Sequence, residues 1–402
     1  MIRANNPTLS SWVAVPLGSD FPIQNLPFGI FKTKGEKPRV CSAIGDYVVD
    51  LAKVNDLAFF ADLEIPKSIF YNQYINDFMA LGKDVTRAVR DRLSEILDEN
   101  ETKWNSREMA KHIFYKMDEV ELLIPIQIGD YTDFYSSIEH ATNVGIMFRD
   151  PANALLPNWK HLPVGYHGRA SSIVVSGTEI KRPKGQQIPK DSKQPVYGPC
   201  KLLDFELEMG FVIGQKTNLG DTVSIQKAED YIFGMCLFND WSARDIQKWE
   251  YVPLGPFLGK NFASTMSPWI VVMDALEPFR VPGPAQDPPV LPYLKYDGDK
   301  NYDINLAVKI KPEGSRSTIV SESNFKYMYW NMSQQLTHHT VNGCNIIPGF
   351  GLKIMSSLIC PSLSSSGPGE TGSVPLFGYQ TVTPVPGSET DISILLVFEY
   401  KL

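Results

Sequence analysis

The sequence lacks the features that mark several classes of protein. Its 402 residues include 38 basic and 45 acidic residues, a formal net charge of −7, so the chain offers no positive field for nucleic acid or anionic lipid. No apolar run approaches the ~20 residues that a membrane span needs, and the best of them, residues 392–398, is far too short. Residues 1–12 show no basic start followed by an apolar block, so we expect no secretory signal.

Cysteine is scarce, and no nucleotide-binding motif is present. The five cysteines form no C-x-x-C pair and are widely scattered: Cys41, Cys200, Cys236, Cys344 and Cys360. This usage argues against a disulfide framework or a zinc site and suits a reducing compartment, so we expect a cytoplasmic protein. Without a G-x-G-x-x-G or P-loop sequence, nucleotide binding has no support.

Proline and glycine, in contrast, are plentiful. The chain contains 30 Pro and 29 Gly, and proline exceeds its average share of ~5%, which favours strands and loops over helices. The length exceeds the roughly 250–300 residues at which a single core stops growing. We therefore expect two domains, residues 1–119 and residues 120–402.

Hydrophobic patterning predicts the main elements of both domains. In the first, residues 39–43 and 47–51 predict two strands around a turn, and residues 84–97 predict a helix with Arg90 on its polar face. Strand-like runs alternate with loops in the second domain: residues 173–175, 205–213, 270–273 and 304–310. One further helix is expected over residues 325–337.

The end of the chain has a different composition. Of the 53 residues from 350 to 402, 20 are Ser, Gly or Pro, which predicts a flexible segment. Only residues 391–400 have a clear strand character.

The strongest local signal is the alternation of acidic and apolar residues over 203–211. Residues i and i+2 of a strand point to the same face, so Asp204, Glu206 and Glu208 should share one face, with the apolar residues on the other. Carboxylates placed side by side repel one another unless a cation or a base neutralises them. An inward face would suit a hard cation such as Ca²⁺ or Mg²⁺, whereas an outward face would be an ordinary solvated surface.

A second polar segment, residues 129–140, contains carboxylates, phenols, hydroxyls and a histidine. Histidine is the usual general base at neutral pH, which makes His140 a candidate for that role. The alternative is ordinary polar packing, which is the commoner role of a lone histidine.

Four later residues are also candidates for chemistry. Asp240 follows an apolar run, where a strand ends and a site often begins, and Lys260 lies in an apolar, glycine-rich loop. A lysine in that setting can stabilise a developing oxyanion, or it can be a surface lysine whose stem packs on the protein. The adjacent His338 and His339 should point to different sides of a helix or strand, so we favour a structural role over metal chelation.

Several long contiguous motifs extend across the chain, from residues 20–27 to residues 343–345. They include DYTDFYSS (130–137), HATNVGIMFR (140–149), LPVGYHGR (162–169), the strand with Glu206 and Glu208, NDWSARD (239–245) and PFLGK (256–260). Motifs of this length are far more specific than a short pattern. Together they strongly resemble the fumarylacetoacetate hydrolase family.

The resemblance implies a reaction, a fold and an assembly. The reaction is the metal-dependent hydrolysis of the C–C bond of 4-fumarylacetoacetate to fumarate and acetoacetate, the last step of tyrosine and phenylalanine catabolism. The fold is mainly β with some α, with a small N-terminal SH3-like β-barrel and a larger mixed β-roll catalytic domain. A homodimer is also implied, and neither nucleic acid nor membrane is an expected partner.

The resemblance also implies roles for individual residues. The expected Ca²⁺ or Mg²⁺ ligands are Asp133, Glu206, Glu208 and Asp240. Lys260 and Ser264 match a neighbouring Mg²⁺ site, where the family usually has threonine in place of Ser264. His140 matches the general base that would take a proton from water. The substrate contacts would be Tyr135, Arg149, Tyr166, Gln247 and Tyr251. Arg149, Gln247 and Lys260 would stabilise the developing negative charge.

The sequence departs from the family after Gly349. The family continues with an Ala-Ser-Gly-Thr-Ile-Ser-Gly motif and then a strand whose glutamate pairs with the catalytic histidine, and neither is recognisable here. Counting without gaps places Ser356 and Glu370 at the threonine and glutamate positions, but their neighbours do not match. We expect this tail, which is shorter than the family's, to deprive the β-roll of strands and His140 of its orienting partner. A frame or splicing error, or real divergence, would explain it.

Two alternatives to an active fumarylacetoacetate hydrolase remain at this stage. One is a catalytically impaired family member that keeps only metal and substrate binding or dimerisation, which the unusual tail favours. The other is a related decarboxylase or hydratase acting on another oxo-acid, which the near-continuous match in both domains disfavours.

Overall fold

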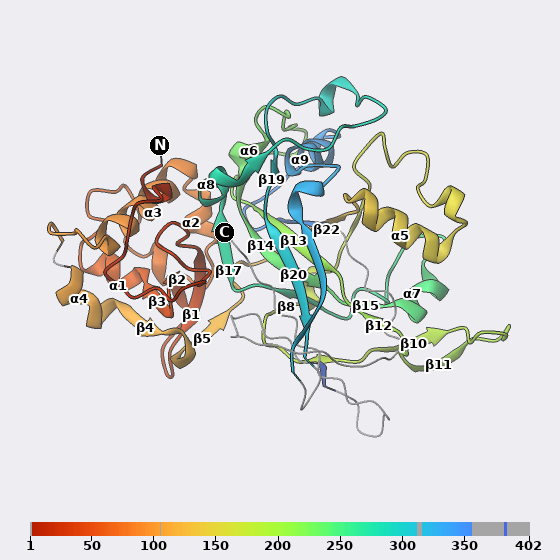
Figure 1. The fold of residues 1–402 in the computed structure, drawn as a ribbon, viewed down its shortest axis with the longest axis horizontal. Helices are drawn as coiled ribbons and strands as arrows, with labels where there is room; N and C mark the ends of the chain where they lie inside the picture. Colours follow the sequence, from red (N-terminus) through yellow and green to blue (C-terminus); the bar gives the residue numbers. More distant parts are fainter. Residues whose placement is uncertain (1, 105, 312–315, 356–381, 384–402) are drawn as a thin grey trace.

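A single large sheet forms the centre of the molecule. The computed structural model describes residues 2–104, 106–311, 316–355 and 382–383, and it shows a mixed α/β fold (Figure 1). The main path of the sheet runs β4 (Phe114–Lys116), β3 (Tyr47–Asp50), β2 (Arg39–Ile44), β1 (Phe28–Lys32), β17 (Trp269–Val272), β14 (Ile232–Asp240), β13 (Leu207–Ile213), β22 (Gly351–Met355), β6 (Tyr131–Phe134) and β7 (Gly165–His167). Three more strands join its sides: β5 (Glu121–Leu123), β8 (Ile173–Val175) and β16 (Ser264–Met266).

Smaller sheets and short helices surround this sheet. The two-stranded sheets are β9 (Ile180–Lys181) with β23 (Val382–Thr383), β10 (Lys184–Gln187) with β11 (Val196–Pro199), β12 (Leu203–Asp204) with β15 (Ser242–Ala243), β18 (Arg280–Val281) with β19 (Asn301–Tyr302), and β20 (Asn305–Ile310) with β21 (Thr318–Asn324). The α-helices are α1 (Leu51–Asp56), α2 (Asn76–Ala80), α3 (Lys83–Leu97), α4 (Ser106–Ile113), α5 (Ile138–Phe148), α6 (Ala228–Tyr231), α7 (Arg244–Glu250), α8 (Met273–Leu276) and α9 (Met332–Thr340). Within the described residues, no helix combines the length and the apolar character needed to cross a membrane.

The predicted strand pair near the N-terminus is confirmed. Strands β2 and β3 pair from Ile44 and Tyr47 outward, and Gly45 makes the turn with φ +51°. A Cβ at Gly45 would lie 2.6 Å from the carbonyl oxygen of Ala14, so this turn requires glycine. The second strand ends before Leu51, because the Asp50 carboxylate accepts a hydrogen bond from the backbone and caps α1.

Helix α3 confirms the predicted helix over residues 84–97, but the placement of Arg90 on its solvated face was wrong. Arg90 is 1% exposed. Its Nε donates to the Asn25 carbonyl oxygen at 3.0 Å, and its Nη2 donates to Asn5 Oδ1 at 2.8 Å. Segments from the N-terminus therefore cross this face of α3 and supply acceptors, which helical periodicity alone does not reveal.

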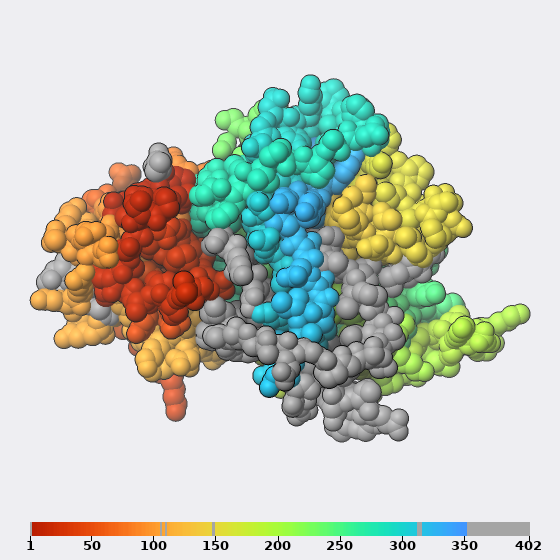
Figure 2. Space-filling model, in the orientation of Figure 1, coloured from red at the N-terminus to blue at the C-terminus, as the bar shows by residue number. Residues whose placement is uncertain are grey.

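The two domains expected on either side of residue 120 share one continuous sheet. Strand β1 pairs with β17 at Phe28↔Ile270 and Gly29↔Trp269, and β5 pairs with β1. The N-terminal strands therefore extend the sheet that also contains β13 and β14. Figure 2 shows the red and orange N-terminal part packed against the segments that follow it. The domain boundary stays a prediction.

The first residues after the departure from the family still form part of the sheet. Strand β22 pairs antiparallel with β13 and parallel with β6, so it joins these two strands into one surface. The expectation that this part of the chain removes a strand from the sheet was therefore wrong for Gly351–Met355. The predicted flexible segment lies largely outside the described residues, and so does the strand expected over residues 391–400.

The helix expected over residues 325–337 begins later. A 3₁₀ turn occupies Phe325–Tyr327, and α9 begins after Asn331. The Asn331 side chain accepts a hydrogen bond from the Gln334 backbone, while the Gln334 side chain accepts one from the Asn331 backbone. This capping box fixes the start of α9.

Candidate active site

The acidic alternation over residues 203–211 lies inside the protein. Glu206 and Glu208 are 2% and 0% exposed, and the apolar residues beside them, Phe205 and Leu207, belong to the core. The solvated-surface interpretation is therefore wrong for both glutamates. The regular strand β13 begins at Leu207 rather than at residue 205.

Asp240 lies directly across from Glu206. The Glu206 N–H donates to the Asp240 carbonyl oxygen at 3.1 Å, and the Asp240 N–H donates to the Glu206 carbonyl oxygen at 3.2 Å. Directly opposed residues of an antiparallel pair present their side chains on the same face. The side chain of Glu208, two residues further on, follows on that face.

Three buried carboxylates converge here, and we call them the acidic triad: Asp133, Glu208 and Asp240. One oxygen of each lies within 4.8 Å of the others. Asp133 comes from β6, which β22 separates from β13. Strands two places apart in a flat sheet are about 9.6 Å apart, so the side chains must meet on a concave face.

Tyr166 adjoins the acidic triad. It lies opposite Asp133 in the pairing of β6 with β7. Burial raises the pKa of the Tyr166 phenol well above its usual range, and the charges of Asp133 and Asp240 raise it further. The phenol therefore keeps its proton as a hydrogen-bond donor beside the carboxylates.

Lys260 and Ser264 both contact Asp240. The Lys260 Nζ donates to Asp240 Oδ2 at 2.7 Å and to Glu206 Oε2 at 2.6 Å, and the Ser264 Oγ donates to Asp240 Oδ1 at 3.2 Å. Burial lowers the pKa of Lys260, but the two carboxylates outweigh it and the net shift is upward. Lys260 is thus a buried ammonium group, and the surface-lysine interpretation is wrong.

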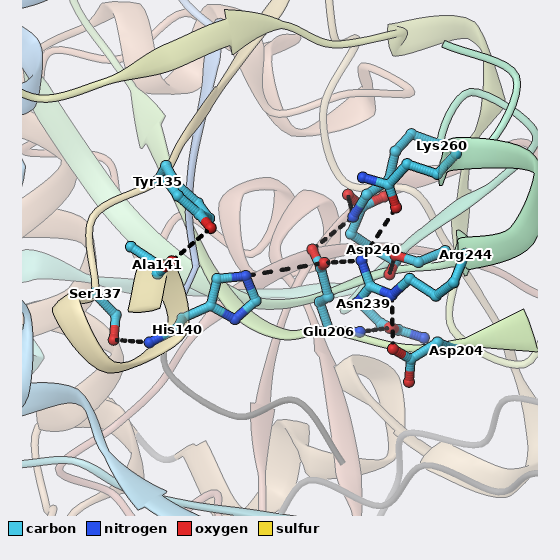
Figure 3. Close-up of polar contacts among 12 residues, drawn as sticks. Tyr135, Ser137, His140, Ala141, Asp204, Glu206, Asn239, Asp240, Arg244 and Lys260 are labelled. Carbon is cyan, nitrogen blue, oxygen red and sulfur yellow. Dashed lines mark hydrogen bonds and ion pairs between the residues drawn. The ribbon is translucent and has the colours of Figure 1, made fainter. Parts of the chain in front are cut away.

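Glu206 lies between three basic groups (Figure 3). Its Oε1 is 2.8 Å from Arg244 Nη1 and 4.0 Å from His140 Nε2, while its Oε2 accepts from Lys260. Arg244 begins α7, and its Nε donates to Asp204 Oδ2 at 2.7 Å. The structure therefore sets Glu206 beside the acidic triad, and through Lys260 it shares an ion-pair network with Asp240.

His140 lies in the first turn of α5 and is 1% exposed. The Ser137 Oγ caps this helix by accepting the His140 backbone N–H at 3.2 Å. Figure 3 shows the imidazole directed toward Glu206. The ring of Tyr135 lies edge-on to the imidazole, with ring centroids 5.5 Å apart.

Two of the predicted substrate contacts flank α5. The Tyr135 hydroxyl donates to the Ala141 carbonyl oxygen at 3.0 Å, and Arg149 Nη2 donates to the Ala154 carbonyl oxygen at 2.7 Å. Burial and the charge of Glu206 raise the pKa of Tyr135, and Arg149 opposes the shift. Tyr135, Arg149 and Glu206 therefore lie close enough for their charges to influence one another.

The other two predicted substrate contacts are Gln247, on α7, and Tyr251, directly after that helix. Gln247 is buried, and its Oε1 accepts from Arg244 Nη1 at 3.2 Å. Gly259 packs so closely against it that a Cβ there would lie 2.7 Å from the Gln247 Cβ. Tyr251 caps the C-terminal end of the same helix, one turn beyond Gln247.

The residues present fit a divalent cation. Four buried carboxylates (Asp133, Glu206, Glu208 and Asp240) and the half-buried Asp204 face two buried cations (Arg244 and Lys260), so acidic groups outnumber basic groups. Burial raises the pKa of Asp240 to about 7, against the lowering effect of Lys260. A divalent cation would balance this charge, and an all-oxygen donor set is the one that Ca²⁺ and Mg²⁺ prefer.

Some functional residues escaped the sequence analysis, and some predictions lie outside the described residues. Arg244 stands inside the motif 239–245, but nothing local indicates that it pairs with Glu206. Ser356 and Glu370 lie outside the described part of the chain. His338 and His339 have separate partners, Tyr293 and Thr132, so the two side chains point to different sides of α9, as expected for adjacent residues.

Comparisons with known proteins agree along most of the chain. The family model described as fumarylacetoacetate (FAA) hydrolase C-terminal matches residues 131–349, and the model described as fumarylacetoacetase N-terminal matches residues 24–125. The chain is 56% identical to the fumarylacetoacetase of Homo sapiens over 342 residues, covering 84% of this chain and 82% of that one. It is 52% identical to the fumarylacetoacetase of Mus musculus over 367 residues, covering 90% and 86%.

Among solved structures, the fumarylacetoacetate hydrolase of Exiguobacterium antarcticum has a TM-score of 0.47 and 16% identity, covering 82% of this chain and 85% of that one. The assignment rests on the family models and the curated relatives. This chain belongs to the fumarylacetoacetate hydrolase family.

Proposed function

We propose that this protein is a fumarylacetoacetase. It hydrolyses the C–C bond of 4-fumarylacetoacetate to fumarate and acetoacetate, the last step of tyrosine and phenylalanine catabolism. Curated fumarylacetoacetases at 50–56% identity over most of both chains support this reaction. The observation that carries the proposal is the convergence of His140, Glu206 and the acidic triad on one buried site.

Asp133, Glu208 and Asp240 would hold Ca²⁺ or Mg²⁺, with Glu206 beside them. When bound, the cation would supply Lewis-acid character and a template for the two oxygens of a β-diketone. The choice between the two ions depends on the size and rigidity of the site. Lys260 and Ser264, at the predicted neighbouring Mg²⁺ position, both contact Asp240, and protonated Lys260 serves there as a charge partner because an ammonium group cannot ligate a metal.

His140 acts as the general base. It takes a proton from water as the water oxygen attacks the substrate carbonyl carbon, and the bond from that carbon to its neighbour then breaks. The Glu206 carboxylate, 4.0 Å from His140 Nε2, stabilises the positive charge that the imidazole gains. The departing carbanion takes up the proton that His140 removed from water and becomes acetoacetate, while the attacked carbon leaves as the new carboxylate of fumarate.

Cationic and amide groups stabilise the negative charge that moves through the substrate. Lys260, Gln247 and Arg149 are the predicted donors, and Arg244 reinforces them through its contacts with Glu206 and Gln247. Arg149 also suits a substrate carboxylate by bidentate pairing. Tyr135, Tyr166 and Tyr251 complete the proposed substrate contacts.

Several broader features of the family extend to this chain as proposals. They are an SH3-like N-terminal β-barrel over residues 1–119, a β-roll catalytic domain over residues 120–402, a homodimer and a cytoplasmic location. A continuous sheet through β1 and β17 would then connect the two domains.

The competing proposal is a catalytically impaired member of the family. It is not favoured, because the curated relatives match 84–90% of the chain and the family model spans residues 131–349, the range that contains the predicted site residues. The deciding experiment measures loss of fumarylacetoacetate by the purified protein and by its His140→Ala variant. We expect a fall of at least about 100-fold in kcat for His140→Ala and no change for His112→Ala, an exposed histidine in α4. Full activity of His140→Ala would refute the proposed base, and an inactive wild-type protein would refute the proposed reaction.

A further inference from the structure

Helix α9 supports the strand that carries Asp133. His339, near the end of α9, places its Nε2 2.9 Å from the Thr132 hydroxyl oxygen on β6. Its ring also lies edge-on to two aromatic rings, with centroid distances of 6.4 Å to Phe134 and 4.9 Å to Phe350. The imidazole is therefore held between β6 and the residue that precedes β22.

The alternation of β6 connects this contact to the acidic triad. Thr132 and Phe134 point to the face that meets His339, so Asp133 between them points to the opposite face. Asp133 is 1% exposed and reaches Glu208 and Asp240 there. A rotation of β6 about its own axis would move Thr132 and Asp133 in opposite directions, so the contact with His339 opposes a rotation that would withdraw the carboxylate.

The His339 ring is suited to a fixed contact. Its Nδ1 atom is buried and has no hydrogen-bond partner within the described residues. Burying an N–H group without an acceptor costs more free energy than burying an unprotonated ring nitrogen. We therefore assign the proton to Nε2, which donates to the Thr132 hydroxyl oxygen. Burial, with smaller effects of His167 and His338, lowers the pKa of His339 to about 4, and the ring is therefore neutral near pH 7.

We propose that His339 is a positioning residue that holds Asp133, through Thr132, in the geometry that binds the divalent cation. Nothing in the predicted catalytic machinery requires this residue. The inference rests on the proposed metal site, but it concerns the affinity of that site and not the reaction.

Substitutions on both sides of the contact test this role. His339→Leu and Thr132→Val each remove the hydrogen bond, and Thr132→Val keeps nearly the same shape. His339→Gln keeps an amide donor close to the position of Nε2. His338→Leu is the matched control, because His338 contacts Tyr293, 3.0 Å away, and not β6.

The measurement is calorimetric titration of each EDTA-treated, dialysed protein with CaCl₂ and with MgCl₂. We expect His339→Leu and Thr132→Val to weaken metal affinity by about 10–100-fold, the usual effect of removing a group that orients a metal ligand. His339→Gln should stay within about threefold of wild type, and His338→Leu should not change. The double variant of Thr132 and His339 should bind no more weakly than His339→Leu alone, because both changes remove one interaction.

Each outcome decides the proposal. Unchanged metal affinity in Thr132→Val overturns it, even if His339→Leu fails to fold. Equal weakening in His338→Leu overturns it as well, since general loosening of α9 would then be the cause. If the wild-type protein binds metal but does not hydrolyse fumarylacetoacetate, the proposed reaction fails while the positioning role is still decided by the titrations. If the wild-type protein binds no metal, both proposals fall.

Discussion

Glu206 Oε1 lies 2.8 Å from Arg244 Nη1 and 4.0 Å from His140 Nε2, so one carboxylate connects a fixed cation to the proposed base. The other predicted metal ligands, Asp133, Glu208 and Asp240, instead have oxygens within 4.8 Å of one another. This geometry favours the proposal that the acidic triad binds the metal while Glu206 orients the base.

Glu206→Gln and Asp133→Asn should separate these two functions. We expect Glu206→Gln to lower kcat by about 100-fold or more while changing metal affinity by less than about tenfold. Asp133→Asn should weaken metal affinity more strongly, because it neutralises a member of the acidic triad. Glu139→Gln, an exposed carboxylate next to His140, is the control and should match wild type. If Glu206→Gln and Asp133→Asn lose metal affinity equally, Glu206 is a metal ligand and this division is wrong.

Lys260→Met should affect both stability and catalysis. The ammonium group pairs with Glu206 and Asp240 at 2.6 and 2.7 Å, and methionine fills similar space without the charge. Leaving buried carboxylates without this partner should lower the free energy of unfolding of the EDTA-treated protein by about 3 kcal/mol. Loss of the cation at the reacting centre should also lower kcat by about 100-fold. Urea denaturation and steady-state kinetics measure these effects, and a variant equal to wild type in both would contradict the role of Lys260.

Acid should destabilise the protein partly through His339. Burial lowers its folded pKa to about 4 from the ordinary value of 6.5, so the unfolded chain binds the proton more readily. The stabilisation is therefore fully present above about pH 6.5 and is lost as pH falls towards 4, with a total of about 3 kcal/mol. His339→Gln should lose less unfolding free energy than wild type between pH 7.5 and pH 5, measured with urea in EDTA. Parallel stability curves would show that His339 does not titrate in this range.

Local patterns predicted much of the site. The alternation around Glu206 and Glu208 predicted that both share one face, because the period of a strand depends only on neighbouring residues. The start of α9 was also readable, since Asn331 and Gln334 have the spacing of a capping box. The prediction of a helix from residue 325 does not use this signal and therefore starts too early.

Contacts between residues far apart in the sequence could not be predicted from local patterns. Arg244 meets Glu206, and His339 meets Thr132, only because the sheet and α9 bring these segments together. Helical periodicity predicts that Arg90 is solvated. In the structure it is buried, because Asn5 and Asn25 provide hydrogen-bond acceptors for its guanidinium group. Strand β22 pairs with β13 and β6 through backbone hydrogen bonds, which any residue except proline can make. It therefore forms even though its sequence differs from that of the family.

The most direct test of the account measures fumarylacetoacetate hydrolysis by EDTA-treated protein as Ca²⁺ or Mg²⁺ is added back, for wild type and for Glu208→Gln. We expect no hydrolysis in EDTA and full recovery of the wild-type protein with metal. Glu208→Gln should require roughly 100-fold more metal, because it loses one charge of the acidic triad. Hydrolysis that continues unchanged in EDTA, or a metal requirement that is the same for both proteins, would contradict it.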